Sequence, residues 1–391
     1  MSEEDKMEKK RYYNVDFLRI AFVVLIVYYH FIRTPYVAAY NIPLLENLAQ
    51  NAAWTGTVGN AILFVISGFF LFPSLLKQDE PFLKFAIRKL MRFWPVLCFA
   101  VASIGILSLF NLVSFDVGQN VLNIFLITAG GGGLTNKLTN LNVTWFVCAL
   151  FWCSLFYCAL FKVIKDRFKF NFVVVIISYF NLVIYLNSSL RDYQVIHGVF
   201  SRAGAVAMAL IGVGILLNQL YNQINWDKIK TNTNFLTLLE AGLITYLAWG
   251  CIFKKFKETY MVMLIASVAL FILFLINKGY IARFLNKPIF SAIGKYAFAI
   301  YIMQEVSFVF YKNYIWNQTV LVTTHPILTI FISLFLSITL GVFTYHLIED
   351  PCAKFLKKKL LDNYDSYIKI SGGGKTLITT GIEITDMLNE D

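Results

Sequence analysis

The sequence predicts an all-α polytopic membrane protein with about ten transmembrane helices and both termini in the cytoplasm. Of its 391 residues, 58% are hydrophobic and only 15% are charged, and the mean hydropathy is +0.65. A soluble domain of this size would carry more charge. Apolar windows long enough to cross a bilayer recur along the chain. They cover residues 14–33, 56–76, 93–113, 144–161, 170–187, 197–217, 234–253, 259–276, 288–311 and 326–348.

Basic residues between the windows set the orientation. With the N-terminus inside, the cytoplasmic segments carry most of the Lys and Arg residues, as the positive-inside rule requires. In chain order these segments lie before residue 14 and at 77–92, 162–169, 228–230, 278–287 and 354–359. One outer cluster, Lys254, Lys255 and Lys257, breaks the rule. Either it contacts anionic headgroups or an acidic acceptor, or the windows around it are wrongly placed. The net charge of +11 thus reflects cytoplasmic loops and not nucleic-acid binding.

Other segments complete the predicted organisation. Residues 121–129 are apolar but too short to cross, and a re-entrant or interfacial piece is expected there. The charged residues 1–13 lack an apolar signal-peptide core, so the first window is expected to be an uncleaved signal anchor. We expect residues 1–352 to form the membrane domain and residues 353–391 a short cytoplasmic tail. The cysteines show no metal-ligand spacing, and no metal is expected.

The first window carries polar residues that a plain membrane anchor would not. Asp16, Arg19 and His30 interrupt an apolar run. At about 100° and 1.5 Å per residue they share one helix face, with Arg19 and His30 roughly 16 Å apart along the axis. A charged side chain at mid-membrane costs about 2.5–3.5 kcal/mol, so this face is expected to look into a cavity. The alternative is an interfacial ion pair of Asp16 and Arg19, with His30 packed inside the bundle.

A second constellation lies in a segment expected at the cytoplasmic surface. Arg88, Lys89 and Arg92 would crowd one side of a helix, where like charges repel each other. An anionic group is expected to offset them, and phosphate fits because guanidinium groups bind it in bidentate fashion. Ordinary positive-inside anchoring is the alternative.

The two constellations together suggest a division of labour. The cations would hold the phosphates of a soluble donor, and His30 would do acid–base chemistry, since imidazole exchanges a proton near neutrality. Asp16 lies about 21 Å from His30 along the helix, too far to orient the ring. A partner must come from another helix, and Glu305 is our preferred candidate. Glu240 is another carboxylate inside a window, where such groups are functional candidates by default.

Five stretches, in order, resemble the membrane acyltransferase family 3, which comprises bacterial O-acetyltransferases of cell-surface polysaccharides. The first is Asp16-x-x-Arg19 followed by His30. The others are Leu63-Phe64-Val65-Ile66-Ser67-Gly68-Phe69, Arg88-Lys89-x-x-Arg92-x-x-Pro95, Ile293-Gly294-Lys295-Tyr296 with Ile300-Tyr301-Ile302, and Ile348-Glu349-Asp350-Pro351. The resemblance covers nearly the whole predicted membrane region.

The resemblance implies transfer of an acyl group from cytoplasmic acyl-CoA to a hydroxyl of a glycan or lipid-linked sugar. Acetyl-CoA is the expected donor, and the bacterial inner membrane is the expected location. His30 would be the catalytic histidine, assisted by Arg19 and Asp16, with Glu305 as the further candidate. Whether His30 acts as a base or carries the acyl group covalently stays open. The candidate donor-binding residues are Arg88, Lys89, Arg92, Ser67, Trp145, Tyr301 and Gln304. Expected protein partners are a second copy or proteins of polysaccharide assembly.

Departures from the family pattern qualify this interpretation. Lys89 stands where the family usually has arginine, which weakens bidentate phosphate contact. Gln304 stands where many members have histidine. The fourth window opens on Trp145, as in the family, but lacks the glutamates of many members. Two other classes stay open. One is an exporter or flippase of a lipid-linked sugar, and the other is a family member that has lost activity and serves in assembly.

Overall fold

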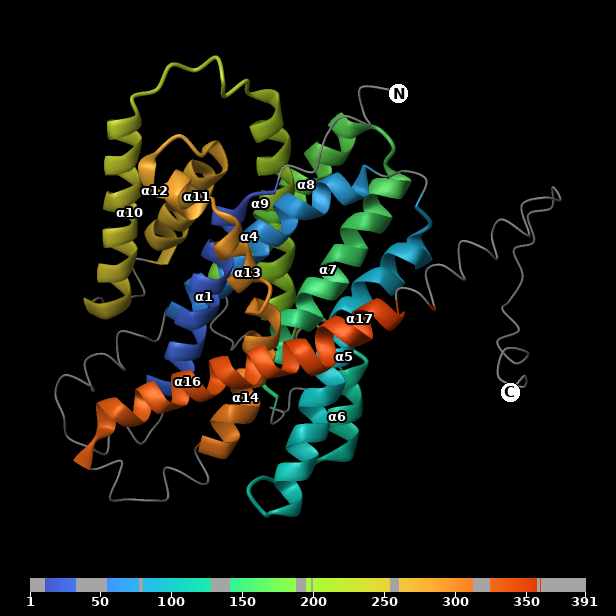
Figure 1. Cartoon of the computed structure of the whole chain (residues 1–391). Helices are drawn as coiled ribbons and strands as arrows, with labels where there is room; N and C mark the ends of the chain where they lie inside the picture. The colour runs from blue at the N-terminus through green and yellow to red at the C-terminus, as the bar shows by residue number, and fades with distance from the viewer. Residues whose placement is uncertain are drawn as a thin grey trace, which may run out of the picture.

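The computed structural model describes residues 11–32, 55–76, 80–127, 141–187, 195–197, 200–253, 260–311, 324–356 and 359. Within these residues the chain is almost entirely helical, which confirms the predicted all-α membrane class (Figure 1). Seven of the described helices are long and apolar enough to cross a membrane, and α11 is a shorter apolar helix. The total of ten crossings stays a prediction. The cluster at 254–257 and nearly all of the tail fall outside the described residues.

The elements follow one another in this order. They are α1 (Tyr13–Ile32), α4 (Thr55–Leu75), α5 (Phe82–Leu109), α6 (Val117–Ile124), α7 (Thr144–Val163), α8 (Arg167–Asn187), the strands β1 (Val195–His197) and β2 (Phe200–Ser201), α9 (Arg202–Gln223), α10 (Thr233–Phe253), α11 (Tyr260–Ile276), α12 (Tyr280–Leu285), α13 (Pro288–Gly294), α14 (Ala297–Phe310), α16 (Pro326–Thr344), the π-helical turn η4 (Tyr345–Glu349) and α17 (Asp350–Leu356). The strands form one short antiparallel hairpin.

Three of the differences between the helices and the predicted windows have a local cause. The third helix begins at Phe82, directly after Pro81, so the basic segment belongs to the helix itself. The sixth begins at Arg202, where the Ser201 hydroxyl accepts a hydrogen bond from the Gly204 amide (3.0 Å), and residue 197 lies in the hairpin. The ninth window is two helices, α13 and α14. Hydropathy finds the apolar middle of a span, whereas capping and proline decide where the helix starts.

The bundle is built around α4, which packs closely against α9. A Cβ atom on Gly68 would meet the carbonyl group of Ile211, and one on Gly214 would meet that of Val65. Glycine at both positions lets the two backbones touch, as small residues do at membrane helix interfaces. Gly68 therefore explains part of the Leu63–Phe69 motif by packing alone.

Helix α1 is tied to the α11–α13 region. The buried Asn14 amide donates hydrogen bonds to the carbonyl groups of Phe274 (2.7 Å) and Ala282 (3.3 Å). A Cβ atom on Gly294 would meet the backbone of Asp16, so α13 also approaches α1 closely. Two of the motifs named above, Asp16-x-x-Arg19 and Ile293–Tyr296, therefore contact each other. In Figure 1, α16 runs across the front of α1 and α14.

The buried carboxylate of Glu240 has a structural role and is not part of a reaction site. Its Oε2 accepts hydrogen bonds from the backbone amides of Ile281 (3.1 Å) and Ala282 (3.2 Å), at the start of α12. Thr237 Oγ1 accepts from the amide of Tyr280 (2.9 Å). The first amides of a helix lack partners within the helix, and α10 supplies them here. Glu240 joins α10 to α12 and is a capping residue.

Replacing Glu240 with alanine should lower the free energy of unfolding by about 2 kcal/mol, because two amides would lose a charged acceptor. Thermal unfolding of the purified protein in detergent measures the change. The Glu240→Gln variant keeps a side-chain oxygen and should lose less. An alanine variant as stable as the wild type would contradict the capping role.

Candidate active site

Arg19 is held in place by a carboxylate and an aromatic ring. Its Nη1 lies 3.2 Å from Asp16 Oδ1, one helical turn earlier. The guanidinium carbon stands 4.8 Å from the centre of the Phe70 ring of α4, within cation–π range. Arg11 Nε also approaches the same carboxylate, at 3.6 Å from Oδ2. Asp16 therefore pairs with Arg19, as the alternative interpretation of this face expected, and Phe70 of α4 lies against the guanidinium.

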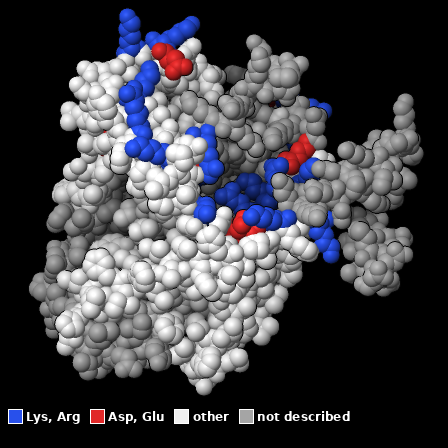
Figure 2. Space-filling view, in the orientation of Figure 1, with Lys and Arg blue, Asp and Glu red and all other residues white. Residues whose placement is uncertain are grey.

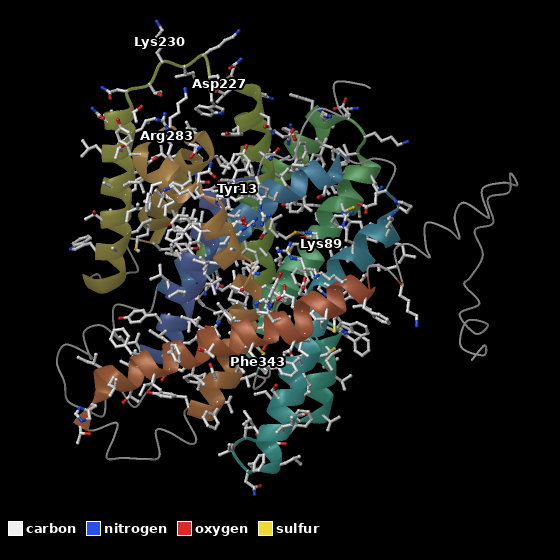
Figure 3. The ribbon with its side chains drawn as sticks, in the orientation of Figure 1. Tyr13, Lys89, Asp227, Lys230, Arg283 and Phe343 are labelled. Atoms are coloured by element: carbon white, nitrogen blue, oxygen red, sulfur yellow. The ribbon has the colours of Figure 1, made fainter. Side chains whose placement is uncertain are left out.

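The cations of α5 converge on the same place from a second helix. Arg92 interacts electrostatically with Arg19 and with Lys89, and Lys89 also interacts with Arg88 and Arg19. We call Arg19, Arg88, Lys89 and Arg92 the basic cluster. Figure 2 shows a hollow in the molecular surface with Lys and Arg atoms at its floor, and Figure 3 labels Lys89 at the corresponding place. The structure thus brings together residues that are about 70 positions apart in the sequence.

Carboxylates of the protein itself supply part of the negative charge that was predicted to offset the cations of α5. Glu80, which precedes α5, forms an ion pair with Arg88, and its carbonyl oxygen accepts a hydrogen bond from Lys162 Nζ (2.6 Å). Glu349 of η4 interacts electrostatically with Arg92. Among the described residues, neither Lys89 nor Arg92 forms an ion pair within 4.0 Å. Two cations of the cluster are therefore left for an external anion.

His30 lies at the other end of α1, near the helix terminus. It is half-buried, and its ring centre is 5.0 Å from that of Tyr29. The next residue, Phe31, packs against Phe308 (5.7 Å) and Tyr311 (5.5 Å) at the end of α14. Helix periodicity puts His30 on the same side of α1 as Arg19. Arg19 and His30 therefore mark the two ends of one side of α1, with the buried apolar Val23 and Ile26 between them and α14 beside the upper end.

Glu305 lies on α14, one turn below the contact between Phe31 and Phe308. Three residues separate it from Phe308, about 4.5 Å along the axis in the direction of Arg19. The side chain is 8% exposed, and its Oε2 has no hydrogen-bond partner among the described residues. The neighbouring Gln304 is completely buried and donates to the Tyr301 carbonyl group (2.8 Å). Gln304 Oε1 likewise has no hydrogen-bond partner among the described residues, so both side chains of this pair hold a buried oxygen without a donor.

An aromatic layer joins the remaining candidates. Phe146 of α7 packs against Phe64 of α4 (4.4 Å) and Tyr301 of α14 (5.2 Å), and Trp145 lies 6.3 Å from Phe64. Tyr301 also donates a hydrogen bond to the Val143 carbonyl group (3.3 Å). Trp145, Tyr301 and Gln304 therefore belong to this layer and not to the basic cluster.

Ser67 is placed on the same face of α4 as Phe70, one turn nearer to His30. It is half-buried, on a helix whose other residues are mostly inaccessible. The contact of Phe70 with Arg19 therefore brings Ser67 beside the polar face of α1.

The last two motifs also meet. Tyr296 Oη lies 3.0 Å from His346 Nε2, and the Tyr296 and Tyr345 rings are 5.0 Å apart. His346 is thus an anchoring residue where the start of α14 meets η4. Four residues near the cluster were not predicted, namely Glu80, Lys162, Phe70 and Glu349 as a partner of Arg92. Only Glu349 carried a signal, because it belongs to a quoted motif.

Comparison with known proteins finds one match. A family model described as an acyltransferase domain matches residues 12–346. The match includes α1 with Arg19 and His30, the three cations of α5, and Glu305. No curated protein and no solved structure matches the chain.

Proposed function

Because the chain belongs to acyltransferase family 3, we propose that it transfers an acyl group from cytoplasmic acyl-CoA to a hydroxyl of a cell-envelope polysaccharide or lipid-linked sugar. The observation that carries this proposal is the polar face of α1. One end of it meets cations from α5, and the other end carries a half-buried imidazole. This arrangement suits a phosphorylated donor that enters from one side and a reaction that takes place at the other.

Acetyl-CoA is the donor we propose, with its phosphates at the basic cluster. Arg92 and Lys89 lack ion-pair partners among the described residues, and Arg88 shares its charge with Glu80. Phosphate oxygens would form charge-assisted hydrogen bonds with these groups. Arg19, deeper along the same face, would hold the donor where the pantetheine arm begins.

His30 would act on the thioester by one of two routes. In the first, the imidazole takes the proton of the acceptor hydroxyl while that oxygen attacks the thioester carbonyl carbon. The carbon–sulfur bond then breaks, and the imidazolium returns the proton to the CoA thiolate. In the second, an imidazole nitrogen displaces the CoA thiolate and forms an acyl-imidazole, which the hydroxyl then attacks. Both routes leave an O-acyl ester, free CoA and a neutral histidine.

Two carboxylates would support this chemistry in different ways. Asp16 fixes the Arg19 guanidinium through the 3.2 Å contact and stays far from the imidazole. Glu305 is the buried carboxylate one turn below the end of α1 and is our proposed partner of the reacting groups. The likeness of the motifs to O-acetyltransferases of surface polysaccharides supports a sugar hydroxyl as acceptor and the bacterial inner membrane as the location.

The test is transfer itself. Membranes that contain the protein should transfer label to envelope glycan from acetyl-CoA that is labelled in its acetyl group, and membranes without the protein should not. Surface glycan from strains with and without the gene should differ in its acyl groups, which mass spectrometry measures. If glycan export changes while its acylation does not, the protein is an exporter and this proposal is wrong.

A further inference from the structure

Helix α4 has one stripe that is less deeply buried than the rest of its surface. Between residues 58 and 72, the apolar side chains away from this stripe are at most 4% exposed. Four positions exceed that value: Asn60 and Leu63, each 9% exposed, and the half-buried Ser67 and Phe70. Their spacing of three, four and three residues puts them on one face of the helix.

This stripe faces the polar side of α1. At its lower end, the guanidinium carbon of Arg19 lies 4.8 Å from the centre of the Phe70 ring. At its upper end Gly59, the neighbour of Asn60, lies against Ile26 and the Phe22 carbonyl group of α1. Helix α4 therefore runs antiparallel to α1, and Asn60 lies at a level between Arg19 and His30.

Asn60 of α4 and Glu305 of α14 lie at a similar level of the bundle. Asn60 is four residues before Phe64, and Glu305 is four residues after Tyr301; both aromatic residues pack on Phe146. Helix α14 runs parallel to α1, because Gly294 lies against Asp16 before α14 and Phe308 lies against Phe31 at its end. Both polar residues therefore lie about 6 Å along the axis from the Phe146 layer, in the direction of His30. Two polar groups from separate helices thus lie at one level of the bundle, between the levels of Arg19 and His30.

Both residues present a buried oxygen that lacks a partner. Neither Asn60 Oδ1 nor Glu305 Oε2 accepts a hydrogen bond from any of the residues that the structure describes. Buried acceptors without a donor are costly, and they are uncommon in native proteins. A molecule that fits between these oxygens must therefore bring N–H or O–H groups.

We propose that Asn60 is a binding residue for the pantetheine arm of acyl-CoA, accepting a hydrogen bond from an amide N–H through Oδ1, with Glu305 Oε2 of α14 as a second acceptor at the same level. This inference rests on the proposed function, which brings the arm past these residues. The phosphates, the thioester carbonyl and the sulfur only accept hydrogen bonds, whereas the arm carries amide N–H groups. An acceptor hydroxyl is the other possible source of a donor, but it reaches the thioester from the His30 end.

The test compares two probes that differ only by the arm, which makes the unidentified sugar unnecessary. Binding of CoA and of adenosine 3′-phosphate 5′-diphosphate, the nucleotide part of CoA with all three phosphates, is measured by calorimetry on the purified full-length protein. The Asn60→Leu variant has nearly the same shape but no acceptor. It should bind CoA about three- to tenfold more weakly than the wild type. Its affinity for the nucleotide, which has no arm, should be unchanged and also reports that the variant is folded.

The matched control is Asn181→Leu on α8, a helix that packs on α9. Asn181 Oδ1 is likewise buried without a partner among the described residues. This variant should bind both probes as the wild type does. If Asn60→Leu does not fold, Asn60→Ser carries the same expectation, because its shorter side chain does not reach the arm.

Two results would overturn the inference while leaving the proposed function intact. One is equal CoA affinity in Asn60→Leu and the wild type. The other is slower transfer to glycan with CoA affinity unchanged, which would assign the oxygen to the acceptor hydroxyl. A wild-type protein that binds the nucleotide and CoA equally well would also reject the arm site. If it binds neither probe, the donor proposal itself fails.

Discussion

Replacing His30 with alanine should reduce acyl transfer by about 10²–10⁴-fold, the range usual for loss of an acid–base group, and by more if the imidazole carries the acyl group. The ring is the titratable group at the upper end of the polar face of α1, and alanine can neither accept a proton nor attack a thioester. Transfer from labelled acetyl-CoA to glycan gives the rate. CoA affinity should stay near the wild-type value, because the basic cluster lies about 16 Å away along the helix.

The matched control is His325→Ala. His325 is exposed at the start of α16, and its loss should leave transfer unchanged. An active, folded His30→Ala enzyme would refute the mechanism. Pre-steady-state kinetics without acceptor then separate the two routes. A burst of one CoA per wild-type protein indicates an acyl-histidine, and the absence of a burst indicates direct transfer.

Replacing Arg92 with alanine should raise KM for acetyl-CoA about tenfold while kcat changes little. Charge-assisted hydrogen bonds to phosphate contribute about 1.5–3 kcal/mol. The Arg92 side chain is exposed, so solvent screening reduces that value. Steady-state kinetics at varied acetyl-CoA and fixed acceptor measure both constants. The Arg92→Lys variant should fall in between, because it keeps the charge and loses the bidentate geometry.

Arg167→Ala provides the control for a general loss of positive charge. Arg167 is an exposed arginine at the start of α8. It should leave KM for acetyl-CoA unchanged. Equal effects of the Arg92 and Arg167 substitutions would mean that both arginines only attract anions or anchor the protein at the bilayer. An unchanged KM in Arg92→Ala would remove Arg92 from the phosphate site.

The helical class was predictable because apolar length is a local property of the chain. The windows at 14–33, 56–76 and 144–161 agree with α1, α4 and α7 to within two residues at each end. The start of α5 at Phe82 was not found, since its first turns are polar and the window method follows hydropathy. The break between α13 and α14 was also missed. It lies next to the close approach of Gly294 to Asp16, which depends on a helix far away in sequence.

The candidate site was predictable to the extent that it lies on single helices. Periodicity put Arg19 and His30 on one side of α1, and spacing grouped Arg88, Lys89 and Arg92 on α5. Periodicity within one helix cannot show which helix lies opposite. The ion pair of Glu80 with Arg88 and the Phe70 ring below Arg19 went unnoticed for that reason.

By itself, the sequence determined that this chain is a helical membrane protein, that one face of its first helix is polar, and that its motifs resemble those of an acyltransferase. Tertiary structure alone decided that Glu240 caps α12, that the cations of α1 and α5 form one cluster, and that Asn60 and Glu305 are buried at one level of the bundle. The physical reason is the range of the forces involved. Hydrophobicity and helix periodicity act within a segment, whereas ion pairs, caps and unpaired buried oxygens depend on which segments pack together.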